Sequence, residues 1–180
     1  TVCVDDYNAG EMAAQLLYAR GHKRIAYLEP GVSTRHTVLC KAGFSDTLSK
    51  YGIKIKPEDI VIESDNAEKN MGLLKELLSC RNRPTAVFST SSSIMPSLYE
   101  VLNKLRINIP DDVEVLGYKD TLISQLLNPK LTVLDMPIEN MVRQCLQLVI
   151  DMMNGHMQFH ANVIVKNDFI IRESCGGFPD

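Results

Sequence analysis

The segment Ile109-Pro-Asp-Asp-Val-Glu-Val-Leu-Gly-Tyr118 follows a stretch with helical periodicity, and it separates that stretch from a run of β-branched residues. A proline and two acidic residues close the helix, and the run that follows predicts a strand that ends at Gly117. In an open α/β sheet the ligand crevice lies beyond the carboxyl ends of such strands. The segment therefore favours a protein that senses something small over a structural protein.

The same alternation of strand and helix patterns extends on both sides of this segment. Strands are expected at 2–4, 24–28, 60–63, 85–88 and 113–116, and helices at 8–19, 36–50, 68–78 and 94–105. Strand and helix alternate about every thirty residues, which predicts right-handed βαβ units. The expected fold class is α/β, a doubly wound and mostly parallel sheet with helices on both faces.

After Pro129 the rhythm changes. The pattern predicts a strand at 131–134, a long helix at 138–153, and a β pair formed by 163–166 and 169–171 across Asn167-Asp168. This last part of the chain either completes the first sheet or serves a second lobe, and the pattern leaves both open.

Composition narrows the class of protein. The 180 residues are 45% hydrophobic and 23% charged, as in an ordinary globular domain. The net charge of −3 gives no general attraction to nucleic acid, and no apolar run is long enough to span a membrane. Five scattered cysteines without a CxxC pair favour reduced thiols in a cytoplasmic protein. The histidines are not spaced for metal binding with cysteine, so neither metal nor cofactor is expected.

Seven short motifs occur in a fixed order along nearly the whole chain. They are Val4-Asp5, Gly21-His22-Lys23-Arg24-Ile25-Ala26, Ala42-Gly43-Phe44, Arg83-Pro84-Thr85-Ala86-Val87-Phe88, Ile109-Pro110-Asp111-Asp112-Val113 with Gly117-Tyr118, Pro129 with Leu131-Thr132, and the stretch from Ile170 to Ser174. In this order they resemble the effector-binding region of the lactose-repressor (LacI/GalR) family of bacterial transcription regulators. No single motif is decisive, but the ordered set is specific.

The resemblance implies a periplasmic-binding-protein-like fold of two lobes that the chain crosses three times. Residues 7–128 and 161–172 would form the C-terminal lobe, and residues 131–158 would belong to the N-terminal lobe. The chain starts near the first crossing, so the DNA-binding head and most of the N-terminal lobe are expected to lie outside it. The helix at 138–153 would then expose an apolar stripe, which favours association with a neighbouring molecule.

The resemblance also implies where an effector binds. The expected ligand-binding positions are Thr34, Arg35, His36, Cys40, Ala67, Ser91, Ser92, Lys119 and Ile138. The family commonly has an arginine, an aromatic residue, an Asn-Asp pair and an aspartate where this chain has Cys40, Ala67, Ser91-Ser92 and Lys119. The charge of the site is therefore changed.

Two interpretations of this change remain open. In one, Lys119 with Arg35 or His36 receives an anionic effector such as a sugar phosphate, helped by the Ser89–Ser93 run at a helix N-terminus. In the other, the site binds no small molecule, and the protein responds to a partner or acts constitutively.

A homodimer is also implied by the resemblance. Its C-lobe contacts would be Pro96, Tyr99, Glu100, Ile123, Leu126 and Leu127. Apolar residues in a loop support burial there, although ordinary packing within the lobe would explain them equally well.

The sequence thus predicts a non-enzymatic ligand-sensing domain, which would act on operator DNA through a helix-turn-helix outside this chain. A transport-type solute-binding protein of the same architecture is the alternative, which the cysteines and motifs disfavour. An enzyme is a third possibility, but the chain has no phosphate loop, dinucleotide fingerprint or catalytic triad. The Ser89–Ser93 run is interpreted as a helix cap and Asp111-Asp112 as a turn.

Overall fold

Two sheets of unequal size organise the chain in a computed structural model that describes residues 1–155, 162–177 and 179. Across these residues the large sheet has six strands and the small sheet has two. In spatial order the large sheet contains β3 (Ile60–Ile62), β2 (Ile25–Glu29), β4 (Ala86–Ser89), β5 (Glu114–Tyr118), β6 (Thr132–Asp135) and β8 (Asp168–Ile170). Its first five strands run parallel, and β8 is antiparallel to β6. The expected fold class is therefore confirmed.

Helices cover both faces of the large sheet. One face carries α1 (Asp6–Ala19) and α2 (Arg35–Lys50), and the other carries α3 (Ala67–Ser79) and α4 (Met95–Lys104). The large sheet, these four helices and the short elements η1 (Pro57–Asp59) and α5 (Leu122–Leu126) together form a unit that we call the body. A strand covered on both sides buries every side chain, and all residues of β4 and β5 are buried.

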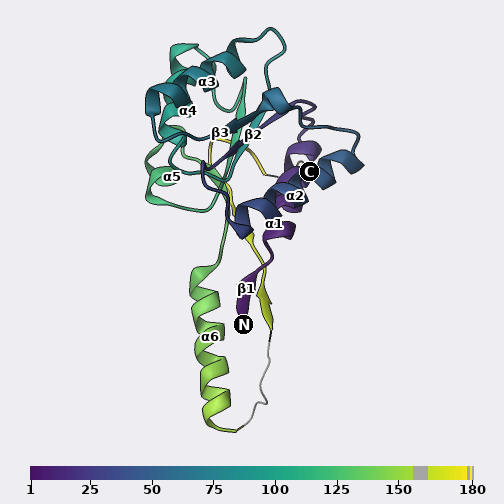
Figure 1. The fold of residues 1–180 in the computed structure, drawn as a ribbon, viewed down its shortest axis with the longest axis vertical. Helices are drawn as coiled ribbons and strands as arrows, with labels where there is room; N and C mark the ends of the chain where they lie inside the picture. Colours follow the sequence, from purple (N-terminus) through teal and green to yellow (C-terminus); the bar gives the residue numbers. More distant parts are fainter. Residues whose placement is uncertain (156–161, 178, 180) are drawn as a thin grey trace.

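A second unit projects from the body. The small sheet pairs β1 (Val2–Val4) with β7 (Val163–Val165) in parallel, and α6 (Ile138–Met153) packs beside it. Figure 1 shows this projecting unit extending away from the body, with the green helix α6 as its longest element. No helix among the described residues is long and apolar enough to cross a membrane.

Helix α6 has no buried residue. Large apolar side chains that are at least half exposed are Ile138, Val142, Leu146, Val149, Ile150, Met152 and Met153. These side chains share one face of α6, opposite the polar residues Asn140, Gln144, Gln147 and Asp151, so the expected apolar stripe is confirmed. An apolar face of this size is ordinarily covered by further protein.

Local sequence explains where the two helices of the first face begin and end. The side chain of Asp5 accepts a hydrogen bond of 2.9 Å from the backbone N–H of Asn8, which caps α1. Thr34 and Thr37 form a reciprocal capping box at the start of α2. Gly21 and Gly52 follow the two helices with positive φ angles of 89° and 75°, a conformation that favours glycine.

Two predictions about the last third of the chain were wrong. Strands β7 and β8 do not form a hairpin, because β7 pairs with β1 and β8 pairs with β6. Asn167 lies between β7 and β8, where the chain passes from the small sheet to the large one. It is buried, and its side-chain amide donates a 3.1 Å hydrogen bond to the carbonyl oxygen of Asp5.

The expected boundary at residue 131 was also wrong, because β6 lies inside the large sheet through Asp135. Of the ranges expected for the lobes, residues 156–158 and 161 lie outside the described part of the chain.

Glu114 at the start of β5 sits in a buried ionic cluster. The Nε of Arg20 donates to both carboxylate oxygens at 2.6 and 2.7 Å, and the Nε2 of His22 lies 3.1 Å from Oε2. Burial alone raises the pKa of Glu114. Hydrogen bonds from His22, Arg20 and Cys175 outweigh burial and lower this pKa from 4.5 to about 2.

This cluster predicts a pH-dependent stability. Because the pKa of Glu114 is lower in the folded than in the unfolded chain, its stabilising contribution is present above about pH 4.5 and is lost as the pH falls toward about 2. We expect Glu114→Gln to lower the free energy of unfolding at pH 7 by on the order of 3 kcal/mol. Urea denaturation of parent and variant at pH 7, 4 and 2.5 measures the difference. An equal loss at all three pH values would contradict this role.

Candidate functional site

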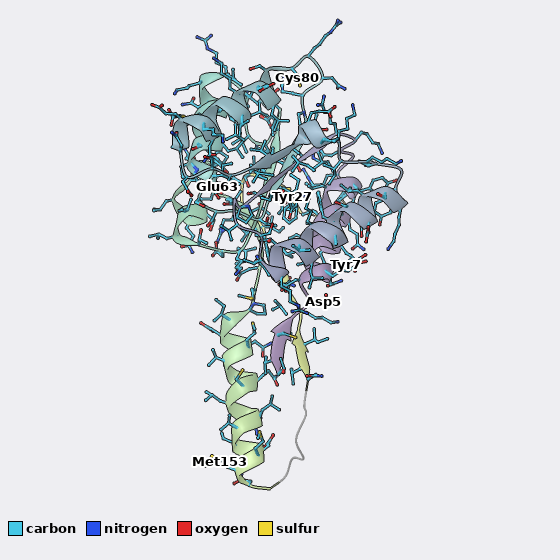
Figure 2. All side chains as sticks on the ribbon, in the orientation of Figure 1. Asp5, Tyr7, Tyr27, Glu63, Cys80 and Met153 are labelled. Atoms are coloured by element: carbon cyan, nitrogen blue, oxygen red, sulfur yellow. The ribbon has the colours of Figure 1, made fainter. Side chains whose placement is uncertain are left out.

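The carboxyl ends of the parallel strands meet along one edge of the large sheet, which we call the carboxyl edge. The residues that end these strands are Glu29, Ile62, Ser89, Tyr118 and Asp135. Figure 2 shows Asp5 at the junction with the projecting unit, whereas Cys80 lies at the far end of the body. Polar loops that follow these strands therefore collect near the junction, where open α/β sheets bind ligands.

A cluster of buried polar groups occupies this edge. The Nδ1 of His36 lies 3.2 Å from Oδ1 of Asp6, and the hydroxyl of Tyr118 donates to the same oxygen at 3.4 Å. The rings of His36 and Tyr118 stack with centroids 5.1 Å apart. The sequence predicted a role for His36, but it gave no sign that Asp6 and Tyr118 would hold this side chain.

The serines that follow β4 form hydrogen bonds with one another and with Glu63. The hydroxyl of Ser89 donates to the carbonyl oxygen of Ser91 at 2.7 Å, and the hydroxyl of Ser91 donates to the carboxylate of Glu63. The oxygens of Ser91 and Ser93 are 3.1 Å apart. Ser91 is buried and fully engaged with these groups, while Ser92 is half-buried.

The prediction that these serines cap the next helix was wrong. Helix α4 begins after Ile94, which provides no side-chain cap, and Pro96 stands in its first turn. The first backbone N–H of that helix, at Met95, donates to the carbonyl oxygen of Ser92 at 3.3 Å and is therefore already satisfied. The serines shape the carboxyl edge instead of completing a helix-terminus anion site.

Two cations at this edge have no counter-charge within the described residues. Lys119, half-buried directly after β5, and Arg35, exposed at the start of α2, take part in none of the ion pairs there. Lys41, by contrast, is neutralised by Glu29, with Nζ and Oε2 2.8 Å apart. Lys119 and Arg35 are thus available to meet an anion at this edge.

An ion pair and a backbone hydrogen bond at Asp120 anchor the loop that carries Lys119. Arg172 donates to both carboxylate oxygens of Asp120 at 2.8 Å, a bidentate geometry that fixes orientation as well as charge. These hydrogen bonds lower the pKa of Asp120 below its usual value. The backbone N–H of Asp120 also donates to Asp135 at 2.9 Å, which ties the loop to the end of β6.

Several other expected ligand residues have structural roles or lie in other elements. Cys40, one helical turn after His36, is fully buried in the core, where burial raises the pKa of its thiol, so this thiol is not open to a ligand from solvent. Thr34 caps α2, and Ile138 begins α6 on the projecting unit with 60% of its side chain exposed. Ala67 begins α3.

A separate groove of about 1320 Å³ runs along β3 and α3. Glu63, Ala67 and Ser93 line it near the carboxyl edge, and Arg24 and Cys80 line its other end. The other ligand positions expected from the sequence are not among its described lining residues. Nothing in the hydrophobic periodicity marks β3 as an edge strand, so the sequence could not have indicated this groove.

The expected dimer residues divide into two groups. Ile123 and Leu127 are half-buried and pack on the core between the sheet, α3 and α4, which fits ordinary packing within the lobe. Leu126 is 74% exposed, and Leu122, one helical turn earlier in α5, is 71% exposed. The sequence analysis missed Leu122.

The remaining expected dimer residues lie on α4. Pro96 and Glu100 are exposed on α4, and Tyr99 is largely buried. A hollow of about 650 Å³ between α4 and α5 is lined by Tyr99, Glu100, Leu126 and Leu127 among other residues. An exposed apolar ridge beside a hollow is a self-complementary shape suited to pairing of two copies.

The arrangement defines a class: an α/β body with a polar carboxyl edge and a second unit joined at that edge. The chain belongs to the family of periplasmic binding protein-like domains, whose model matches residues 14–175. The expected similarity to LacI-type effector-binding regions is confirmed by the regulators that resemble this chain.

Two curated relatives and two solved structures illustrate this similarity. NtdR, the NTD biosynthesis operon regulator of Bacillus subtilis (strain 168), is 25% identical over 94% of this chain and 52% of its own length. The repressor CytR of Escherichia coli (strain K12) is 26% identical over 99% of this chain and 52% of its own length. The chain thus spans about half the length of these relatives.

A LacI family transcription regulator from Clostridium acetobutylicum is 30% identical to this chain. Its structure superposes with a TM-score of 0.80, covering 95% of this chain and 64% of the other. A complex of the transcriptional regulator CelR with cellobiose, 25% identical, gives a TM-score of 0.79 over 96% of this chain and 53% of the other. These relatives are regulators and not enzymes, and they do not favour the transport-protein alternative.

Proposed function

We propose that this chain is the ligand-sensing and dimerisation part of a LacI-type transcription regulator that works in the cytoplasm without catalysing a reaction. A small molecule would bind at the carboxyl edge and bias one arrangement of two lobes over another. That bias would reach operator DNA through a helix-turn-helix elsewhere in the protein. The observation that carries the proposal is the pair of unneutralised cations, Arg35 and Lys119, beside the His36–Tyr118 cluster at this edge.

The effector class we propose is a sugar or a sugar phosphate. Hydroxyl groups suit the mixed donors and acceptors of this edge, and a phosphate would gain charge-assisted hydrogen bonds from Lys119 and Arg35. The structure of the relative CelR was solved with cellobiose, which supports a sugar-like ligand for this fold. A pocket that has lost small-molecule binding is the competing interpretation.

We also propose that the projecting unit belongs to a second lobe. Residues 7–135 and 168–172 would then form one lobe, and α6 with β1 and β7 would be part of the other. The exposed apolar stripe of α6 supports this division, because an apolar face of this size is ordinarily covered by further protein. Two parallel strands alone are too few for a stable sheet, which also favours further strands beside β1 and β7.

A thermal-shift screen on the full-length protein tests the proposal. The panel would contain neutral sugars, sugar phosphates and nucleosides, because a ligand that binds only the folded state raises the melting temperature. A rise with one sugar or sugar phosphate is the expected result. No shift with any compound, together with unchanged binding to operator DNA, would favour the pocket that binds no small molecule.

The Lys119→Ala variant tests most directly whether this lysine binds the effector. If the effector is anionic, we expect its dissociation constant to rise by roughly tenfold or more, since a hydrogen bond to a charged group contributes about 1.5–3 kcal/mol. The melting temperature without ligand should stay near that of the parent, because the lysine has no ion-pair partner among the described residues. Calorimetric titration measures the change, with Lys130→Ala as a matched exposed-lysine control. Unchanged affinity would remove Lys119 from the site.

A further inference from the structure

The chain passes between the body and the projecting unit at three crossings. The first follows β1 at Asp5 and Asp6, the second lies between β6 and α6 at Met136 and Pro137, and the third joins β7 to β8 near Asn167. The crossings lie at the junction between the two units that Figures 1 and 2 show, and Figure 2 labels Asp5 there. The angle between the two units therefore depends on what holds these crossings in place.

One side chain of the body contacts two of the crossings. The hydroxyl of Tyr118 donates to Oδ1 of Asp6 on the first crossing and to Oδ1 of Asn167 on the third, both at 3.4 Å. The amide of Asn167 donates in turn to the carbonyl oxygen of Asp5 at 3.1 Å. All three side chains are more than 90% buried. Burial raises the pKa of Tyr118 and keeps its hydroxyl protonated as a donor.

The same tyrosine also contacts the segment that we assign to the effector. Its ring stacks on His36, whose Nδ1 lies 3.2 Å from the oxygen of Asp6 that Tyr118 contacts. His36 follows Arg35, and Lys119 follows Tyr118 directly. A ligand that displaced His36 or Lys119 would therefore alter the contacts of the crossings without touching them.

We propose that Tyr118, Asp6 and Asn167 form a clamp that sets the angle of the projecting unit, with His36 as the link from the effector loop to the clamp. One hydroxyl hydrogen is shared between two acceptors at long distance, so a small shift of either crossing exchanges one bond for the other. A hinge with two stable angles requires two alternative sets of contacts of similar energy, and the bonds of Tyr118 to Asp6 or to Asn167 provide them. Tyr118 is a positioning residue in this proposal. The link from an effector to the clamp rests on the proposed function, whereas the effect of the clamp on the angle between the units does not.

The distance between two spin labels, one on each unit, tests the clamp without any ligand. One label is attached to the native Cys80, which is exposed on the body, and the other to Gln147→Cys on the polar face of α6, away from the apolar face that a second lobe would cover. The experiment uses the full-length protein, with Cys3, Cys145 and any cysteine outside this chain replaced by serine and with buried Cys40 and Cys175 left in place. Double electron–electron resonance gives the distance distribution.

Tyr118→Phe removes only the hydroxyl, and we expect the distance distribution between the two labels to broaden or to move to a new maximum. Tyr27→Phe is the matched control, because Tyr27 is equally buried and its hydroxyl lies 3.2 Å from Oγ1 of Thr90, away from the crossings. The control should keep the parent distribution. Identical distributions in parent, control and Tyr118→Phe would overturn the clamp. Asn167→Leu provides a second variant should Tyr118→Phe fold poorly, with the same expected change.

His36→Ala tests the link to the effector loop. We expect it to move the distribution in the same direction as Tyr118→Phe, because Asp6 loses its second partner. An unchanged distribution in His36→Ala would overturn the link. Failure of the proposed function has a different signature, namely no thermal shift with any sugar or sugar phosphate, and it would leave these distance changes intact.

Discussion

Gly43→Ala is expected to lower the free energy of unfolding by about 3 kcal/mol. Helices α1 and α2 cross at two glycines, and each glycine lies against the backbone of the other helix. A methyl group at Gly43 would overlap the carbonyl oxygen of Tyr7, and one at Gly10 would overlap that of Cys40. Backbone atoms cannot move aside as the end of a flexible side chain can, so the whole helix pair would have to separate.

Gly72→Ala is the matched control for this substitution. Gly72 lies on the exposed side of α3, and an added methyl group there would meet nothing within 4 Å. Alanine is the better helix former, so we expect this variant to gain about 0.5–1 kcal/mol. Urea denaturation measures both changes. A Gly43→Ala variant as stable as the parent would show that the helix crossing is looser than the structure has it.

Leu126→Asp is expected to convert the proposed homodimer into a monomer at micromolar concentration. Leu122 and Leu126 are exposed one helical turn apart on α5, and Leu126 lines the α4–α5 hollow, so we place Leu126 near the centre of the proposed interface. A charge buried at the centre of an interface costs several kcal/mol, which corresponds to a rise in the dissociation constant of about a hundredfold or more. Sedimentation velocity measures the change.

The control for this variant is Val32→Asp. Val32 is 77% exposed, but it lies on the loop after β2 and away from α5, so the same change in polarity should leave the dimer intact. Leu127→Asp is a poorer test, because Leu127 packs on the core and its replacement would also destabilise the lobe. A dimer that survives Leu126→Asp would remove α5 from the interface.

Much of the body could be predicted from the sequence because its local signals agree. Apolar β-branched runs, helical periodicity and terminal glycines such as Gly21 and Gly52 all pointed to the same alternation of elements. Helix α5 escaped prediction because five residues are too few to show a helical period. The predicted pairing of β7 with β8 was wrong because Asn167 and Asp168 look like a turn in the sequence, whereas tertiary contacts decide which strands pair.

The candidate site was predicted less completely. Motif order placed His36 and Lys119 at the carboxyl edge, because each follows a strand of a parallel sheet. The cluster around them joins Tyr118 to Asp6 across 112 positions and to Asn167 across 49, and no pattern in the sequence reports contacts at that separation. The burial of Cys40 was not predicted, because matching a motif gives a position in a helix but not the side of the helix that faces the core.

Hydrogen–deuterium exchange can locate the ligand on the full-length protein. It would be recorded with and without a saturating concentration of the sugar or sugar phosphate that raises the melting temperature most. Slower exchange is expected at residues 31–36, 89–93 and 118–121, which follow β2, β4 and β5 at the carboxyl edge. Protection confined to the opposite edge of the large sheet, at residues 20–24 and 106–113, would contradict an effector site at the carboxyl ends of the strands.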